Sequence, residues 1–108
     1  MEMKALFGKL LVIASLSLAC LPVFASEVVW IDVRSEAEYE KGHLSQAINI
    51  PHTEIAERIN AVSLEKDAEI KLYCGSGRRA GIAQETLEGM GYTHVSNEGG
   101  YKDLVVDK

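Results

Sequence analysis

The clearest indication of the fold is an apolar, largely β-branched run at residues 28–33, which reads Val-Val-Trp-Ile-Asp-Val. A near-continuous run of this kind is typical of a strand buried on both faces, whereas a strand with one wet face alternates apolar and polar residues. We therefore expect residues 28–33 to lie in the middle of a sheet.

Short strand and helix patterns alternate along the rest of the chain. Ser35 and Glu38 form a capping-box pattern that predicts a helix start, and Gly42 predicts its end. The other expected strands are residues 47–50, 69–73 and 94–96, and the other helical segments are about 53–62, 80–90 and 101–106, with a turn at 98–100. Because strands separated by helices form parallel sheets, the sequence predicts a small α/β fold with helices on both faces.

Residues 1–25 have the pattern of a cleavable signal peptide. Lys4 and Lys9 flank the start of an apolar run at 10–21, and Val23 and Ala25 are small residues at the positions that a signal peptidase reads. The run is shorter than the roughly 20 residues that span a bilayer, so we expect no stable membrane anchor after cleavage. The predicted product is a periplasmic domain of residues 26–108.

The cysteines leave one alternative open and raise one question. Cys20 follows Ser17-Leu18-Ala19, which also permits a lipoprotein site. With cleavage after Ala25, Cys74 is the only cysteine and cannot form an internal disulfide. A lone cysteine is either a buried structural residue or a thiol made reactive by its surroundings.

The charge disfavours several classes of partner. The net charge is −5, and the balance stays acidic without residues 1–25, whereas nucleic acids and anionic membranes require a basic face. His52 and His94 have no nearby acidic or cysteine partner at ligand spacing, so we expect no metal site. We expect a monomer that acts on small molecules.

The segment that follows the strand at 69–73 contains the residues best suited to chemistry. We call it the cysteine loop, and it consists of Cys74, Gly75, Ser76, Gly77, Arg78 and Arg79. A thiolate is a better nucleophile than a thiol, and three features here favour the anion. They are the N-terminal amides of a helix that begins near Ala80, left-handed glycines that turn N–H groups inward, and the arginine charges.

Several motifs in combination resemble the rhodanese family. They are Asp32-Val33-Arg34, Glu38-Tyr39, Gly42-His43-Leu44, Ala47, Asn49-Ile50-Pro51, Cys74-x-x-Gly77-x-Arg79 and Asn97-Glu98-Gly99-Gly100. The resemblance implies a rhodanese-like fold over residues 26–108. It also implies a sulfurtransferase of the thiosulfate:cyanide type, in which a cysteine takes the outer sulfur of thiosulfate and passes it to cyanide or a thiol.

The resemblance also assigns roles to residues. Cys74 would be the catalytic residue that carries the persulfide, and no cofactor is implied. Thiosulfate or the persulfide would be held by Gly75, Ser76, Gly77, Arg78 and Arg79, with a backbone cradle at 75–79 and Arg79 at the position of the family's loop arginine. The matching residues Asp32, Arg34, Glu38 and His43 are interpreted as structural.

Two other functions use similar residues. Cysteine phosphatases and arsenate reductases also place a thiolate under an oxyanion cradle, but their arginine stands six positions after the cysteine, where this chain has Ala80. A persulfide carrier or docking module for a protein partner is the second alternative. Docking modules commonly lack the cysteine, but a carrier needs the same persulfide as an enzyme.

Overall fold

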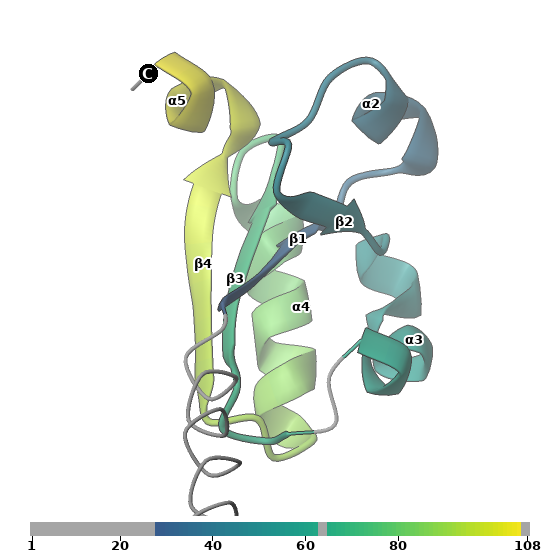
Figure 1. Ribbon diagram of the computed structural model, residues 1–108, viewed down its shortest axis with the longest axis vertical. Coiled ribbons are helices and arrows are strands. Elements are labelled where there is room, and N and C mark those ends of the chain that lie inside the picture. Colours follow the sequence, from purple (N-terminus) through teal and green to yellow (C-terminus); the bar gives the residue numbers. More distant parts are fainter. Residues whose placement is uncertain (1–27, 63–64, 107–108) are drawn as a thin grey trace, which may run out of the picture.

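The computed structural model describes residues 28–62 and 65–106; the expected signal peptide and Cys20 lie outside these residues. Four strands form one parallel sheet in the order β2-β1-β3-β4. They are β1 (Val28–Asp32), β2 (Ala47–Asn49), β3 (Glu69–Cys74) and β4 (His94–Gly100). The expected central position of the first strand is confirmed, because β1 pairs with both β2 and β3 (Figure 1).

The strands are connected by helices, as the alternating pattern predicts. These are α2 (Glu36–Glu40), the 3-10 turn η2 (His52–Glu54), α3 (Ile55–Val62), α4 (Arg78–Gly89) and α5 (Tyr101–Val106). The capping box at the start of α2 is confirmed, since the side chains of Ser35 and Glu38 each accept the other residue's backbone N–H. In Figure 1, α2 and α5 lie near the carboxyl ends of the strands. None of the described helices is long and apolar enough to cross a bilayer.

The larger core lies between one face of the sheet and the helices α3 and α4. Alternate residues of the two central strands point into it, and α4 contributes small or apolar residues from its inner face. Its fully covered members include Ile31, Ile59, Ile70, Leu72, Ala83 and Leu87. This packing fixes α4 against β3, so the connection between them is held at both ends.

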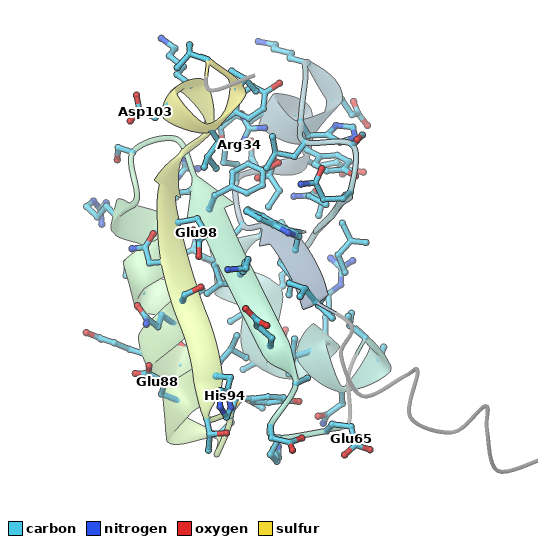
Figure 2. All side chains as sticks on the ribbon, turned by 60° about the vertical axis from the view of Figure 1, so that its left-hand side comes forward. Arg34, Glu65, Glu88, His94, Glu98 and Asp103 are labelled. Carbon is cyan, nitrogen blue, oxygen red and sulfur yellow. The ribbon has the colours of Figure 1, made fainter. Side chains whose placement is uncertain are left out.

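The opposite face of the sheet carries a smaller cluster. Tyr73 is fully buried there with Leu44 and Ala47, and Tyr101 and Leu104 of α5 pack against them. Glu98 points from β4 on the side away from α4 (Figure 2). The fold class is therefore the expected parallel α/β sheet, with α5 covering the second face at its carboxyl end.

A buried ion pair links the end of β1 to the following loop. Asp32 is fully buried and Arg34 is 7% exposed, and their side chains are joined by hydrogen bonds of 2.7 to 3.1 Å. Arg34, which lies below α5 in Figure 2, also donates to the carbonyl oxygen of Gly42 at 2.7 Å and stacks on the ring of Tyr101, with Cζ 4.5 Å from the ring centre. The predicted structural role of Asp32 and Arg34 agrees with these contacts.

Two sequence-based boundaries are wrong. The expected turn at 98–100 belongs to β4, because Leu72 pairs with Asn97 and Cys74 with Gly100, which leaves one extra residue on β4. Gly99 has a φ of +96°, which allows such a bulge without ending the pairing. The helix expected near Ala80 begins two residues earlier, at Arg78.

Candidate active site

Cys74 is the last residue of β3 and lies where the strand turns toward α4. Its neighbours in the sheet are β1 and β4, and its side chain faces the larger core, where it is fully buried. The ends of parallel strands are the usual place for ligands in α/β sheets. The cysteine loop therefore extends from a rigid strand end to the first turn of a packed helix.

The sulfur atom of Cys74 is surrounded by backbone N–H groups. The amide of Gly77 donates to Sγ at an N–S distance of 2.9 Å, and that of Ala80 donates at 3.4 Å. Ala80 lies in the first turn of α4, where amides have no partner within the helix. Both contacts place the positive end of an amide dipole at the sulfur.

These donors change the acidity of the thiol. Burial raises the pKa of Cys74, but hydrogen bonds from the amides of Ala80, Ser76, Gly77 and Arg79 lower it by more, so the pKa of the thiol lies below its ordinary value. An amide cradle thus favours the thiolate despite its buried position. The amides that act on the sulfur belong to residues 76, 77, 79 and 80, so the expected cradle at 75–79 is shifted toward the helix.

Only one of the two loop glycines has the expected conformation. Gly77, the N-cap of α4, has a φ of +97°, which turns the backbone so that its N–H points to Sγ. Gly75 does not have a positive φ. A Cβ atom on Gly75 would instead lie 3.2 Å from Nη2 of Arg79, so this glycine leaves room for the guanidinium group.

The end of β4 supports the loop from the other side. Asn97 donates from Nδ2 to the carbonyl oxygen of Gly77 at 2.8 Å and accepts the N–H of Gly99 at 2.9 Å. A Cβ atom on Gly100 would lie only 2.5 Å from the carbonyl oxygen of Gly75. The sequence predicts a turn here and does not reveal this contact, although Gly100 belongs to a motif that resembles the rhodanese family.

The two loop arginines have different environments. Arg79 is partly buried and reaches back to Glu38 of α2, with Nη1–Oε1 at 2.8 Å and Nη2–Oε2 at 3.2 Å. Arg78 is exposed and has no ion pair within residues 28–62 and 65–106. Ser76 is also exposed, beside the sulfur cradle. The structure thus brings Cys74 and Arg79 into one loop and leaves Arg78 at its rim.

The side chains of Glu38 and His43 are each held by hydrogen bonds to other residues. The ion pair with Arg79 and the hydrogen bonds from Ser35 lower the pKa of Glu38 from 4.5 to about 2. His43 contacts the carbonyl oxygen of Tyr39 through Nδ1 at 2.7 Å and stacks on the Tyr39 ring. The interpretation of His43 as structural agrees with this geometry.

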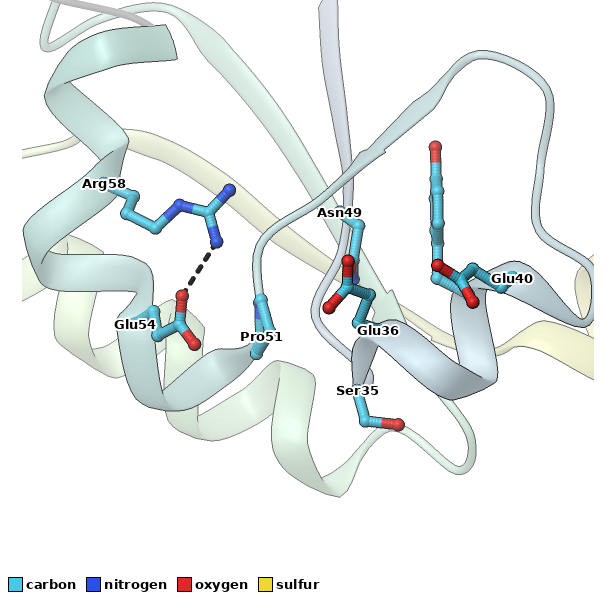
Figure 3. A pocket seen from close by; sticks show the side chains of 8 residues that line it. Ser35, Glu36, Glu40, Asn49, Pro51, Glu54 and Arg58 are labelled. Carbon is cyan, nitrogen blue, oxygen red and sulfur yellow. Dashed lines mark hydrogen bonds and ion pairs between the residues drawn. The ribbon is translucent and has the colours of Figure 1, made fainter.

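A separate pocket of about 550 Å³ lies between α2 and α3. Figure 3 shows Glu36 and Glu40 on one side and the ion pair of Glu54 and Arg58 on the other. Its lining includes Ser35 but none of the residues of the cysteine loop. The backbone N–H groups that donate to Sγ of Cys74 therefore lie outside this pocket.

The chemistry of this site follows from its donors. Among the described residues, the groups that contact Sγ through a hydrogen bond are N–H groups, which stabilise a negative charge and do not ligate a cation. A sulfur anion held in this way can attack an electrophilic sulfur, and the same amides can hold the negative charge on the product. The site is suited to a reaction that begins and ends with an anion on sulfur.

Comparisons with known proteins agree with this geometry. The rhodanese-like domain family matches residues 22–106. The chain is 50% identical over 88 residues to the thiosulfate sulfurtransferase PspE of Escherichia coli strain K12, covering 82% of this chain and 84% of that protein. It is 31% identical over 80 residues to the thiosulfate:glutathione sulfurtransferase of Saccharomyces cerevisiae, covering 64% of this chain and 58% of that protein.

A solved structure described as a rhodanese with anions from E. coli has the same fold. It superposes with a TM-score of 0.69 at 48% identity, covering 71% of this chain and 91% of that one. The family match therefore covers both the parallel sheet and the cysteine loop of this chain. This chain belongs to the rhodanese-like domain family.

Proposed function

We propose that this protein is a thiosulfate sulfurtransferase that carries sulfur as a persulfide on Cys74. The amide cradle around Sγ is the observation that carries the proposal, because it stabilises the thiolate needed for attack. The identity of 50% to a thiosulfate sulfurtransferase along most of both chains supports the same reaction.

The proposed reaction has two steps. The Cys74 thiolate attacks the outer sulfur of thiosulfate; a new S–S bond forms, the bond between the two thiosulfate sulfurs breaks, and its electron pair leaves with sulfite. In the second step the thiolate of an acceptor, or cyanide, attacks the outer sulfur of the persulfide and the Cys74 thiolate leaves. No proton transfer is required in either step when the attacking group is an anion.

The cradle residues have distinct roles in this proposal. The amides of Gly77 and Ala80 hold charge on the sulfur of Cys74, and those of Ser76 and Arg79 add to the same field. Gly75 leaves space beside the guanidinium of Arg79. Arg79, with Arg78 at the rim, provides positive charge for the sulfonate group of thiosulfate.

Sulfur loading is the direct test. We expect incubation with thiosulfate, followed by mass spectrometry of the intact protein, to show a gain of one sulfur atom, about 32 Da. Cys74→Ser should show no gain, and addition of cyanide should return the wild-type mass. If wild-type protein with an alkylation-competent Cys74 gained no sulfur, the proposed function would be wrong.

The acceptor separates an enzyme from a carrier. We expect the loaded protein to yield thiocyanate with cyanide and a persulfide with a low-molecular-weight thiol such as glutathione. Turnover is measured by thiocyanate formation under steady-state conditions. Sulfur release to a protein thiol but to neither small acceptor would favour the carrier function instead.

We also propose that the protein is exported to the periplasm and cleaved after Ala25, leaving a monomer without a membrane anchor. The sequence pattern at residues 1–25 supports the export and the cleavage. The test is the mass of the protein from the periplasmic fraction, which should begin at Ser26. A lipid-modified protein whose modification is lost in Cys20→Ser would show the lipoprotein alternative instead.

A further inference from the structure

The contact between Glu38 and Arg79 joins two segments that are 41 residues apart. The carboxylate comes from the first turn of α2, and the guanidinium comes from the first turn of α4, beside the sulfur cradle. Both oxygens of Glu38 accept from Arg79, one from Nη1 and one from Nη2. Such a two-point contact fixes the plane of the guanidinium as well as its position.

The orientation that results leaves donors free on the loop side. Among contacts between described residues, the only side-chain hydrogen bonds from Arg79 are the two to Glu38, so Nε–H and one N–H on each terminal nitrogen have no acceptor. Nη2 also lies 3.2 Å from the Cβ position of Gly75, directly beside Cys74. The guanidinium group is therefore held by one edge and presents other donors at the cysteine loop.

Glu38 is itself anchored by Ser35, through one of the two oxygens that contact Arg79. Its Oε1 accepts the backbone N–H of Ser35 at 2.9 Å and the Ser35 hydroxyl at 3.0 Å. The capping box thus holds the carboxylate at a fixed place on α2. This provides a rigid connection from the start of α2 to the side chain of Arg79.

We propose that Glu38 is a positioning residue that holds Arg79 in place to bind anionic substrates at Cys74. The inference deepens the proposed sulfurtransferase function and rests on it for the identity of the anion. Glu38 does not touch the substrate and acts through Arg79. Without Glu38 the long Arg79 side chain would sample many rotamers, and its charge would act less on an incoming anion.

Glu38→Gln separates positioning from helix capping. Glutamine also serves in a capping box, so α2 keeps its cap, while the charged two-point contact with Arg79 is lost. Glu36→Gln is the matched control, because it makes the same charge change at an exposed residue of α2, and among contacts between described residues Glu36 has none with Arg79. Arg79→Ala, alone and combined with Glu38→Gln, shows whether Glu38 acts through Arg79.

The first readout does not depend on sulfur transfer. Alkylation of Cys74 by iodoacetate and by iodoacetamide, followed on the Cys74 peptide, compares an anionic reagent with a neutral one. We expect the ratio of the two rates to fall about fivefold in both Arg79→Ala and Glu38→Gln, to fall no further in the double variant, and to stay within about twofold in Glu36→Gln. A rise of the ratio in Glu38→Gln would mean that Glu38 masks the charge, and would overturn the proposal.

The second readout uses the reaction itself. In Glu38→Gln we expect KM for thiosulfate to rise about fivefold while kcat changes less than about twofold, since an orienting contact for the bound anion is lost. An equal change in Glu36→Gln, or an additive loss in the double variant, would assign the effect to the overall charge of α2 or to a separate role of Glu38. If wild-type protein failed to load sulfur, the proposed function would fail, while the alkylation ratio would still decide the role of Glu38.

Discussion

At the scale of single residues, Gly77 connects backbone conformation to chemistry. Its φ of +97° points its amide at Sγ, and an added Cβ would also contact Cα of Gly99 at 3.5 Å. We expect Gly77→Ala to lower the free energy of unfolding by about 1–2 kcal/mol, the cost of a left-handed conformation with a side chain, and to slow sulfur loading. Urea denaturation and the loading rate measure both effects.

Gly89 is the matched control for this substitution. It lies in α4 without a positive φ, and an added Cβ would meet no atom within 4 Å. Gly89→Ala should therefore leave stability unchanged or raise it by up to about 1 kcal/mol, with normal loading. If both substitutions had the same effect, the conformation of Gly77 would not be what matters.

The acidity of Cys74 is a second property of one residue. Because amide hydrogen bonds outweigh burial and lower its pKa, the rate of Cys74 alkylation by iodoacetamide should reach half its maximum at a lower pH in the folded protein than in the unfolded protein. The same protein unfolded in urea is the control and should show the ordinary value, since the cradle is lost. A folded-state midpoint at or above that of the unfolded protein would contradict the proposed activation of the thiol.

At the scale of elements, the buried pair of Asp32 and Arg34 holds the end of β1 to the loop before β2. Asp32→Asn leaves the buried Arg34 charge without its partner, which typically costs 3–5 kcal/mol. We expect a loss of about that size in the free energy of unfolding by urea. The exposed pair of Glu54 and Arg58 is the control, and Glu54→Gln should cost less than about 1 kcal/mol. Similar losses for both variants would show that Asp32 and Arg34 contribute no more than a surface pair.

The elements that the sequence predicts correctly are those defined by neighbouring residues. The β-branched run predicts β1, and Ser35 with Glu38 predicts the start of α2, because both signals are local. The end of β4 was predicted wrongly, since Gly99 and Gly100 are typical of a turn. Pairing with β3 decides the conformation there, and pairing is a long-range property that a local motif does not reveal.

The candidate site also has features that neighbouring residues predict and features that depend on long-range contacts. The place of Cys74 at a strand end before a helix follows from the order of residues along the chain. The Ala80 amide at Sγ depends on where α4 starts, and the contact of Glu38 with Arg79 depends on where the fold places α2 relative to the start of α4. The arginine was therefore predictable as a nearby charge, whereas its orientation required the tertiary structure.

At the scale of the whole molecule, stability should depend on pH through the contact that joins α2 to α4. The pKa of Glu38 is lowered from 4.5 to about 2 in the folded protein, first by the hydrogen bond from Arg79. A carboxyl group with a lowered pKa stabilises the folded state fully above its unfolded-state pKa, and this contribution is lost as pH falls from about 4.5 toward 2. Since Glu38 is partly exposed, solvent screening reduces the size of the effect.

We therefore expect wild-type protein to be more stable than Glu38→Gln at pH 7, with a difference that shrinks steadily below pH 4.5 and disappears near pH 2. Urea denaturation of both proteins at several pH values between 2 and 7 measures this difference. Other carboxyl groups also titrate over this range, but their contributions are common to both proteins and cancel in the comparison. A difference that did not change with pH would show that the glutamine acts through altered packing, and that the ion pair between α2 and α4 adds nothing to the stability of the domain.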